Sequence, residues 1–272
     1  MTRHAHPAVP LRSDLNRMGR LLPCKLQRGW HVVATHRSEA SSRLPALAKT
    51  YGAQLEIETL DILYPEQVAA LRARLGDRSF DMLFVNAGVK NDDSETIADV
   101  STEEFVRVMV TNALSPLRAI ETLRDLVKAN GTIGIMSSGQ GSVTNNQNGG
   151  YEVYRASKAA LNTLVRSFAA RHADERRTLL LMAPGWVRTD MGGPQASLGI
   201  EESIPNLVNT IEARVGRVVS SIWTTAGGPF PGKALSVDGD EVPVDEVDEM
   251  AAERHRCVGC QEETLAGSLG SR

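Results

Sequence analysis

The sequence predicts an α/β protein in which a parallel, doubly wound sheet lies between two layers of helices. Apolar runs of strand length alternate with longer amphipathic segments from Trp30 onward, and this alternation is typical of right-handed β–α–β crossovers. The apolar runs are continuous, as expected for strands that helices cover on both faces. With 272 residues and 42% hydrophobic content, the chain can form one domain with a large core, although length alone would also allow two.

Each predicted strand is a short run rich in aliphatic residues. Strands are predicted at residues 30–35, 54–60, 81–85, 132–136 and 179–183, with a further candidate at 233–237. Helices are predicted between them, at residues 39–51, 66–75, 102–127, 151–172 and 201–214. Ser101 and Glu104 form a capping-box pattern before the third helix, and Pro116 should bend that helix just after Asn112.

Composition and charge argue against several classes of partner. The formal net charge is −3 and aromatic residues make up 4%, so neither a basic surface nor a stacking platform for nucleic acid is predicted. Cys24, Cys257 and Cys260 are too few for a disulfide framework, which favours a reducing cytoplasm. No apolar run is long enough to cross a bilayer, so no membrane contact is expected.

A tyrosine and a lysine four residues apart carry the strongest chemical signal. Tyr154 and Lys158 fall on a predicted helix, so both side chains project from one face. A phenol has an unperturbed pKa of about 10, and a nearby ammonium group lowers it toward the range of a general acid or base. A lone pair of this kind is more often an exposed helix face. Here Ser137 and Ser138 also stand at the carboxyl end of a strand, where open α/β sheets bind ligands.

Ser138 followed by Tyr154-Arg-Ala-Ser-Lys158 resembles the catalytic signature of the short-chain dehydrogenases/reductases. The resemblance covers about residues 30–244 and implies a Rossmann-like fold with three α/β/α layers. The phrases SSGQGS, NNQNGG, YRASKAALN and PGWVRTDMGGP look most similar to the branch of C-factor and sniffer-like carbonyl reductases. The matching residues, in register along the chain, are Asp61, Asn86, Asn112, Ser138, Tyr154, Lys158 and Thr189.

The resemblance also assigns residues to a nicotinamide dinucleotide. Asp61 matches the acid that contacts the adenine, although a strand-end cap would explain it nearly as well. Asn86-Ala87-Gly88 matches the motif that stabilises the sheet beside the cofactor, and taken alone it is a turn signal. On the nicotinamide side the loop begins with Pro184-Gly185. The resemblance implies that Val187 offers its backbone and Thr189 its hydroxyl to the carboxamide.

The end of the second strand favours NADP over NAD. NAD enzymes place an Asp or Glu after this strand to bind the ribose hydroxyls, whereas this strand ends Thr35-His36-Arg37. Arg37 can pair with a 2′-phosphate, and a solvated loop arginine is the alternative. The expected cofactor is therefore NADP, with NAD left open.

The first residues depart from the family pattern. The family begins with a strand and a Gly-rich turn, Thr-Gly-x-x-x-Gly-x-Gly, whose backbone N–H groups hold the pyrophosphate. Gly19 is the only glycine before Gly29, and residues 8–11 make a poor central strand because Pro10 cannot donate to the ladder. We therefore expect a degraded first strand and Gly-rich turn, weak dinucleotide binding and marginal stability, unless residues 5–25 form a replacement.

Three segments are expected along the chain. They are an atypical, partly disordered N-terminal segment at 1–29, the short-chain dehydrogenase/reductase domain at 30–244, and a polar, disordered tail at 245–272. His255, Cys257 and Cys260 in the tail supply only part of a four-ligand zinc site, so no metal is predicted.

The leading hypothesis is an NAD(P)-dependent oxidoreductase that interconverts a carbonyl and an alcohol, with such a small molecule as its partner and a homo-oligomer left open. The resemblance implies that Tyr154 supplies the proton, that Lys158 lowers the pKa of the phenol and holds the nicotinamide ribose, and that Asn112 anchors a water. Ser138 would polarise the carbonyl oxygen, with Ser137 the fallback. The alternative is a protein that keeps the fold without the chemistry, a C-factor-like signalling or binding protein. The missing glycine turn is the observation that suggests it.

Overall fold

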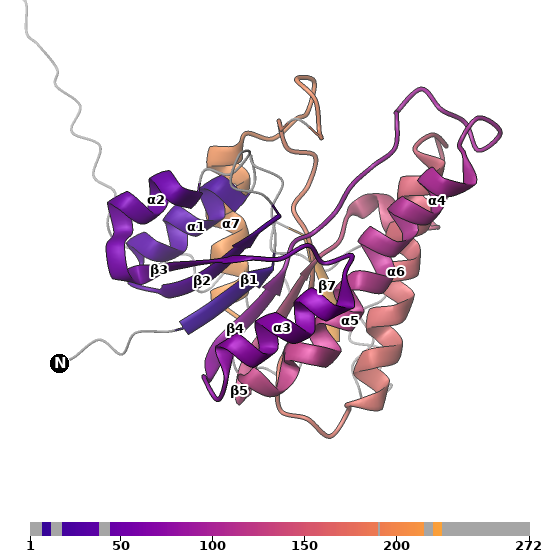
Figure 1. Cartoon of the computed structure of the whole chain (residues 1–272). Coiled ribbons are helices and arrows are strands. Elements are labelled where there is room, and N and C mark those ends of the chain that lie inside the picture. The colour runs from indigo at the N-terminus through magenta and orange to yellow at the C-terminus, as the bar shows by residue number, and fades with distance from the viewer. Residues whose placement is uncertain (1–6, 12–17, 38–43, 190, 215–219, 225–272) are drawn as a thin grey trace, which may run out of the picture.

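The computed structural model describes residues 7–11, 18–37, 44–189, 191–214 and 220–224 (Figure 1). Parallel strands form one sheet of seven, in the order β3-β2-β1-β4-β5-β6-β7. The strands are β1 Pro7–Leu11, β2 His31–His36, β3 Leu55–Thr59, β4 Phe80–Val85, β5 Val127–Met136, β6 Thr178–Ala183 and β7 Ser220–Thr224.

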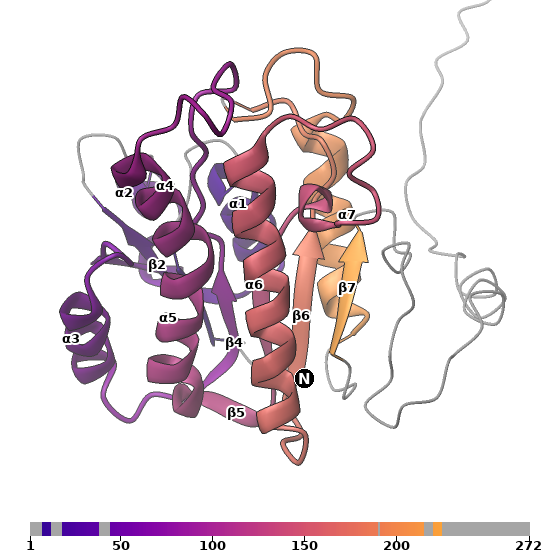
Figure 2. The same ribbon diagram turned by 90° about the vertical axis from the view of Figure 1, so that its right-hand side faces the viewer.

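Helices cover both faces of this sheet (Figures 1 and 2). One face carries α1 Met18–Gln27, α2 Leu44–Tyr51 and α7 Ile200–Glu212. The other carries α3 Pro65–Leu75, α4 Thr102–Met109, α5 Ser115–Leu123 and α6 Glu152–Arg171. The predicted three-layer α/β/α architecture with a doubly wound parallel sheet is confirmed.

Alternate residues of each central strand point into two separate cores. On β6, Leu179 and Leu181 pack with side chains of α3, α5 and α6, whereas Leu180 and Met182 pack with side chains of α1, α2 and α7. Successive side chains of a strand point to opposite faces, so a strand that is covered on both faces is apolar at every position. This is the physical reason for the continuous apolar runs in the sequence.

The first strand keeps its central place between β2 and β4, so a replacement does form within residues 5–25. β1 pairs with β2 at Pro7 and Ala8, and with β4 from Ala8 to Leu11. The pairing with β2 is short, and proline supplies no N–H to a ladder. The helix α1 follows β1 and packs against α7, so part of the segment predicted to be atypical belongs to the sheet and its cover.

The long helix predicted at residues 102–127 is divided. Ser101 caps α4 as predicted, since its hydroxyl accepts a hydrogen bond from the Glu104 N–H (3.1 Å), while the Glu104 carboxylate binds Arg107 instead of closing the capping box. A π-helical turn at Val110–Leu114 separates α4 from α5, and a 3-10 turn at Arg124–Leu126 ends the segment. The irregular turn lies at Asn112, where the bend was expected.

Several sequence predictions differ from the structure at their ends. The strand β7 was not predicted, and β5 begins at Val127 instead of residue 132. The candidate strand at 233–237, the beginning of the helix at 39–43, the tail at 245–272 and the Cys257/Cys260 pair lie outside the described residues. Among the helices that the structure describes, none combines the length and the apolar character needed to span a membrane.

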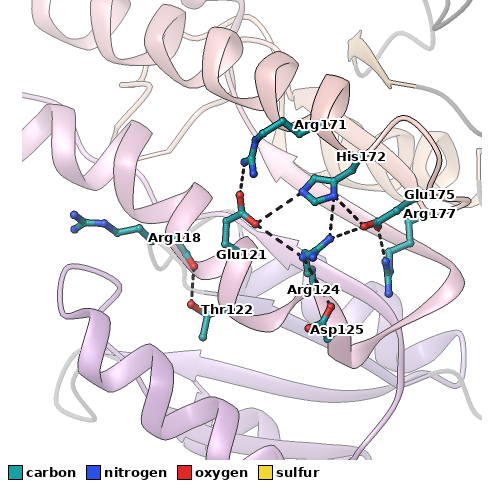
Figure 3. A network of polar contacts seen from close by, with 9 residues as sticks. All are labelled: Arg118, Glu121, Thr122, Arg124, Asp125, Arg171, His172, Glu175 and Arg177. Atoms are coloured by element: carbon teal, nitrogen blue, oxygen red, sulfur yellow. Dashed lines mark hydrogen bonds and ion pairs between the residues drawn. The ribbon is translucent and has the colours of Figure 1, made fainter.

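A polar cluster closes the end of the sheet where β5 and β6 begin (Figure 3). It joins the end of α5, the end of α6 and the loop before β6. Glu175 is its centre: its carboxylate binds Arg124 (2.5 Å), His172 Nδ1 (3.0 Å) and Arg177. Burial alone would raise the pKa of the Glu175 carboxyl, but the hydrogen bond from Arg177 and the nearby positive charges outweigh burial and hold it below its ordinary value.

Candidate active site

The predicted site residues lie at the opposite end, where the parallel strands finish. The strand order reverses between β1 and β4, which is the point where open α/β sheets bind their ligands. The loops that leave β4, β5 and β6 carry Asn86, Ser138 and Thr189, and α6 brings Tyr154 and Lys158 to the same edge.

The helix α6 begins in an unusual backbone conformation. Gly149 and Gly150 have φ angles of 66° and 70°, and Tyr151 has a φ of 51°, which is rare outside glycine. The Arg155 guanidinium holds this entry, since its Nε donates to the Gly150 carbonyl (2.8 Å) and an Nη to the Gly149 carbonyl (3.1 Å). These contacts fix the start of the helix. They therefore also fix the backbone at Tyr154, which directly precedes Arg155.

Lys158 lies beneath Tyr154 on one face of α6. Its ammonium group is 5.9 Å from the centroid of the Tyr154 ring, and Lys158 as a whole is only 3% exposed. Nζ donates a hydrogen bond to the Met136 carbonyl at the end of β5 (3.1 Å). The predicted proximity of phenol and ammonium is therefore present, and the lysine also joins the helix to the central strand.

The two candidate serines differ in what their hydroxyls contact. Ser137 is buried, and its Oγ donates to Asn162 Oδ1 (2.6 Å). Ser138 is partly exposed, and its Oγ accepts from the Gln140 N–H (3.2 Å), so its hydroxyl proton is still available for donation to a ligand. This difference favours Ser138 over Ser137 as the serine that contacts a substrate oxygen.

Asn112 occupies the π-helical turn and is completely buried. Its amide makes a reciprocal pair with Val89: Oδ1 accepts from the Val89 N–H (2.8 Å) and Nδ2 donates to the Val89 carbonyl (2.7 Å). Nδ2 also donates to Ser157 Oγ (2.8 Å), beside Lys158. Asn112 thus joins the loop after β4 to α6, and π-turns of this kind are frequent at functional sites.

The residues assigned to the cofactor lie along the same edge. Asn86 and Ala87 are buried, and Gly88 follows them beside Lys158 and Asn112. Asp61 lies after β3, where its carboxylate accepts from the Leu63 N–H (3.0 Å), a contact that the alternative role as a strand-end cap also explains.

Arg37 is exposed directly after β2, and His36 before it is buried. These two residues lie two strands from β4 along the edge, so the structure does not bring Arg37 next to the predicted catalytic residues. That separation is the one expected of a dinucleotide, whose ends reach different strands.

The loop after β6 is folded back on itself. The Pro184 carbonyl accepts from Ser203 Oγ on α7 (2.8 Å), and Gly185 has a φ of 78°. Val187 is fully buried and forms a bridge to Leu198, while the Thr189 hydroxyl accepts from the Gly192 N–H (3.0 Å). The Thr189 hydroxyl also donates to the Val187 carbonyl (3.3 Å), so its two hydrogen bonds close a turn within this loop.

Three polar residues that support this site were not predicted from the sequence. Ser157 contacts Asn112, Ser203 contacts the loop after β6, and Asn162 contacts both ends of the turn that carries Ser138. Ser157 and Asn162 had a usable signal, because Ser157 lies three residues after Tyr154 and Asn162 four residues after Lys158, and both spacings keep a residue on the same side of a helix. Ser203 had none.

Known proteins resemble the chain over this whole region. A family model described as Enoyl-(Acyl carrier protein) reductase matches residues 25–239. C-signal from Myxococcus xanthus is 36% identical over 134 residues, which are 48% of this chain and 80% of that protein. A short-chain dehydrogenase/reductase from Burkholderia multivorans, solved with bound NADP, is 48% identical with a TM-score of 0.81 and covers 84% of this chain and 99% of that one.

A carbonyl reductase from Pseudomonas aeruginosa PAO1, solved in complex with NADP, is 33% identical with a TM-score of 0.78, over 84% of this chain and 100% of that one. The region that the family model matches contains every predicted site residue, from Arg37 to Thr189. The sheet order, the buried lysine beneath the tyrosine and these relatives agree, and the chain belongs to the short-chain dehydrogenase/reductase family.

Proposed function

We propose that this protein is an NADP-dependent reductase that interconverts a carbonyl compound and its alcohol. The observation that carries the proposal is the arrangement of three groups at the carboxyl edge of the sheet. The Ser138 hydroxyl and the Tyr154 phenol lie on neighbouring elements, with the buried Lys158 ammonium beneath the phenol. The two relatives solved with NADP support the choice of cofactor.

Residues of this chain fit a nicotinamide dinucleotide with a 2′-phosphate. His36 is 4% exposed at the end of β2, and within the described residues its Nδ1 has no hydrogen-bond partner. That buried ring nitrogen and the exposed Arg37 guanidinium offer polar groups at the place where a ribose would lie. The residues that would hold the cofactor are Arg37, Asp61, Asn86, Ala87, Gly88, Tyr154, Lys158, Pro184, Gly185, Val187 and Thr189.

The chain's own residues supply the proton and the orientation in this proposal. When bound, NADPH would supply the hydride for the carbonyl carbon. Ser138 donates a hydrogen bond to the carbonyl oxygen, and Tyr154 donates its phenolic proton to the same oxygen as negative charge develops there. The Lys158 ammonium stabilises the phenolate that remains, because an opposite charge nearby favours the ionised form.

Asn112 holds the site together during this step. Its amide fixes Val89 and Ser157 at once, so the loop after β4 and the helix α6 keep a constant separation. We further propose that the irregular backbone of its π-helical turn binds the water through which a proton returns to Tyr154.

The test is a titration followed by an assay. Nicotinamide fluorescence is followed as NADPH and NADH are added, and NADPH oxidation is then followed with 4-nitrobenzaldehyde as a probe carbonyl. We expect tighter binding of NADPH than of NADH and turnover that depends on the aldehyde. If neither NADPH nor NADH binds, the proposal is refuted.

Two observations favour a second function. The sequence lacks the family's Gly-rich turn, and C-signal is among the similar proteins. A fold relative that signals or binds without chemistry would fail the nucleotide titration while unfolding cooperatively. The same experiment therefore separates the two functions.

A further inference from the structure

Asn162 contacts both ends of the turn that carries Ser138. It lies on α6, one helical turn after Lys158. Its Oδ1 accepts a hydrogen bond from the Ser137 hydroxyl (2.6 Å), immediately before Ser138. Its Nδ2 donates to the Gly141 carbonyl (3.3 Å), three residues after Ser138. One amide side chain therefore uses its acceptor on one end of the turn and a donor on the other.

The turn itself is short and closely packed. Ser138 has an extended backbone and begins the 3-10 turn Gly139–Gly141, and the Gly141 N–H donates back to the Ser138 carbonyl (3.0 Å). A Cβ on Gly141 would lie 2.8 Å from Asn162 Nδ2 and 2.8 Å from the Lys158 carbonyl carbon, a distance that real Cβ atoms do not reach. Glycine at this position lets the turn lie directly against the catalytic helix.

We propose that Asn162 is a positioning residue that sets the place of the Ser138 hydroxyl relative to Tyr154 and Lys158. The inference rests on the proposed reductase function, and in it Asn162 acts through the turn that carries Ser138. Ser138 comes from the loop after β5, whereas Tyr154 comes from α6. On α6, Asn162 binds residues on both sides of Ser138, whereas the hydrogen bond from Lys158 to the Met136 carbonyl lies before both serines.

The same geometry explains why the neighbouring serine does not substitute for Ser138. The Ser137 hydroxyl donates its proton to Asn162, and Ser137 is 2% exposed. Its N–H donates to the Met182 carbonyl of β6 (2.7 Å), which fixes its backbone in the sheet. Ser137 therefore acts as the anchor of the turn, and Ser138 is the residue that the turn presents.

The proposal predicts a selective loss of turnover in Asn162→Ala. A misplacement of about 1 Å at a catalytic group can cost about 100-fold in rate, so we expect kcat to fall by about 10- to 100-fold with 4-nitrobenzaldehyde and NADPH. The Kd of NADPH should change by less than about twofold, because Lys158 and its contact with Met136 stay in place. Asn162→Asp keeps the acceptor for Ser137 and loses the donor to Gly141. Its kcat should therefore lie between that of the unmodified protein and that of Asn162→Ala.

The matched control is Thr163→Ala, the next residue of the same helix. Thr163 is exposed, and within the part of the chain that the structure describes its hydroxyl binds only the Ala159 carbonyl of its own helix (3.1 Å). Thr163→Ala should therefore keep the kcat of the unmodified protein.

A second background distinguishes positioning from general destabilisation. Each variant is also made with Ser138→Ala. If Asn162 acts through the Ser138 hydroxyl, Asn162→Ala should change the residual kcat by less than about twofold once that hydroxyl is gone, because coupled residues are not additive. An equal fold-loss in both backgrounds would overturn the proposal.

Amide hydrogen exchange gives a readout that does not need activity. The Gly141 N–H should exchange at least about tenfold faster in Asn162→Ala and at an unchanged rate in Thr163→Ala. Unchanged Gly141 exchange in Asn162→Ala would refute the positioning role. If the unmodified protein binds no nicotinamide nucleotide, the proposed function fails, and the exchange result still decides whether Asn162 holds the turn.

Discussion

Replacing Glu212 with Gln should destabilise the protein, because the change leaves a buried ammonium group without its counter-charge. Lys25 lies on α1 with a side chain only 7% exposed, and its Nζ is 3.0 Å from Glu212 Oε1 on α7. The ammonium is also 4.1 Å from the Trp30 ring centroid, and Arg28 binds the other Glu212 oxygen (2.5 Å). The prediction tests whether the atypical N-terminal segment is part of the folded domain.

The expected magnitude follows from the exposure of the two partners. Removing one partner of a fully buried ion pair costs about 3–5 kcal/mol. Glu212 is one-third exposed, the Gln amide oxygen can still accept from Lys25, and the contact with Trp30 remains. We therefore expect a loss of about 1–3 kcal/mol in the free energy of unfolding, since a hydrogen bond to a charged group contributes about that amount.

Urea unfolding of the full chain measures this loss, with Glu56→Gln as the matched control. Glu56 pairs with Arg78 on the surface, with both side chains close to half exposed, and such pairs contribute about 0–1 kcal/mol. The melting temperature should fall by about 2–4 °C for each kcal/mol in a chain of this size. If Glu212→Gln loses no more stability than Glu56→Gln, then α1 is not docked on α7 in solution.

The same pair predicts a pH dependence. Burial, the largest influence on Lys25, lowers the pKa of its ammonium below the ordinary 10.5 despite the opposing charge of Glu212. Between the lowered folded pKa and 10.5 the unfolded chain binds more protons than the folded one, so stability rises with pH in that window. The free energy of unfolding should therefore increase with pH, up to 10.5, more in the unmodified protein than in Lys25→Met. If the free energy of unfolding changes with pH in the same way in the two proteins, burial does not lower the pKa of Lys25.

Three further changes test the site and the far end of the sheet. Tyr154→Phe removes only the proton donor, so kcat should fall by about 10²–10⁴-fold in the aldehyde assay, with an unchanged Kd for NADPH. Retention of more than a few per cent of kcat would exclude Tyr154 as the acid. Arg37→Asp should weaken NADPH on the order of tenfold more than NADH in the fluorescence titration, and equal losses would show that Arg37 does not meet the 2′-phosphate. Glu175→Gln should cost about 1.5 kcal/mol at neutral pH. Because the folded pKa of Glu175 lies below 4.5, this difference should be complete above that pH and shrink as the pH falls through the folded pKa, and urea unfolding at several pH values checks it.

The sequence by itself determined the fold class, because that information is carried by short stretches of chain. A strand covered on both faces is apolar over a continuous run, as residues 82–85 of β4 and 179–183 of β6 are. The Tyr154–Lys158 pair was equally readable, since a separation of four residues places two side chains on one helical face whatever surrounds them. The Ser101 cap was local for the same reason.

Tertiary structure decided the features that depend on partners distant in sequence. Pro7 and Pro10 argue against a strand by their own propensities, yet β2 and β4 offer unpaired edges on both sides, and pairing with them outweighs the missing N–H groups. The preference for Ser138 over Ser137 as the substrate-binding serine depended on Asn162, which lies on α6, 25 residues after Ser137 in the chain. Local pattern cannot report such contacts, because their energy comes from groups that become neighbours only when helix and strand have packed.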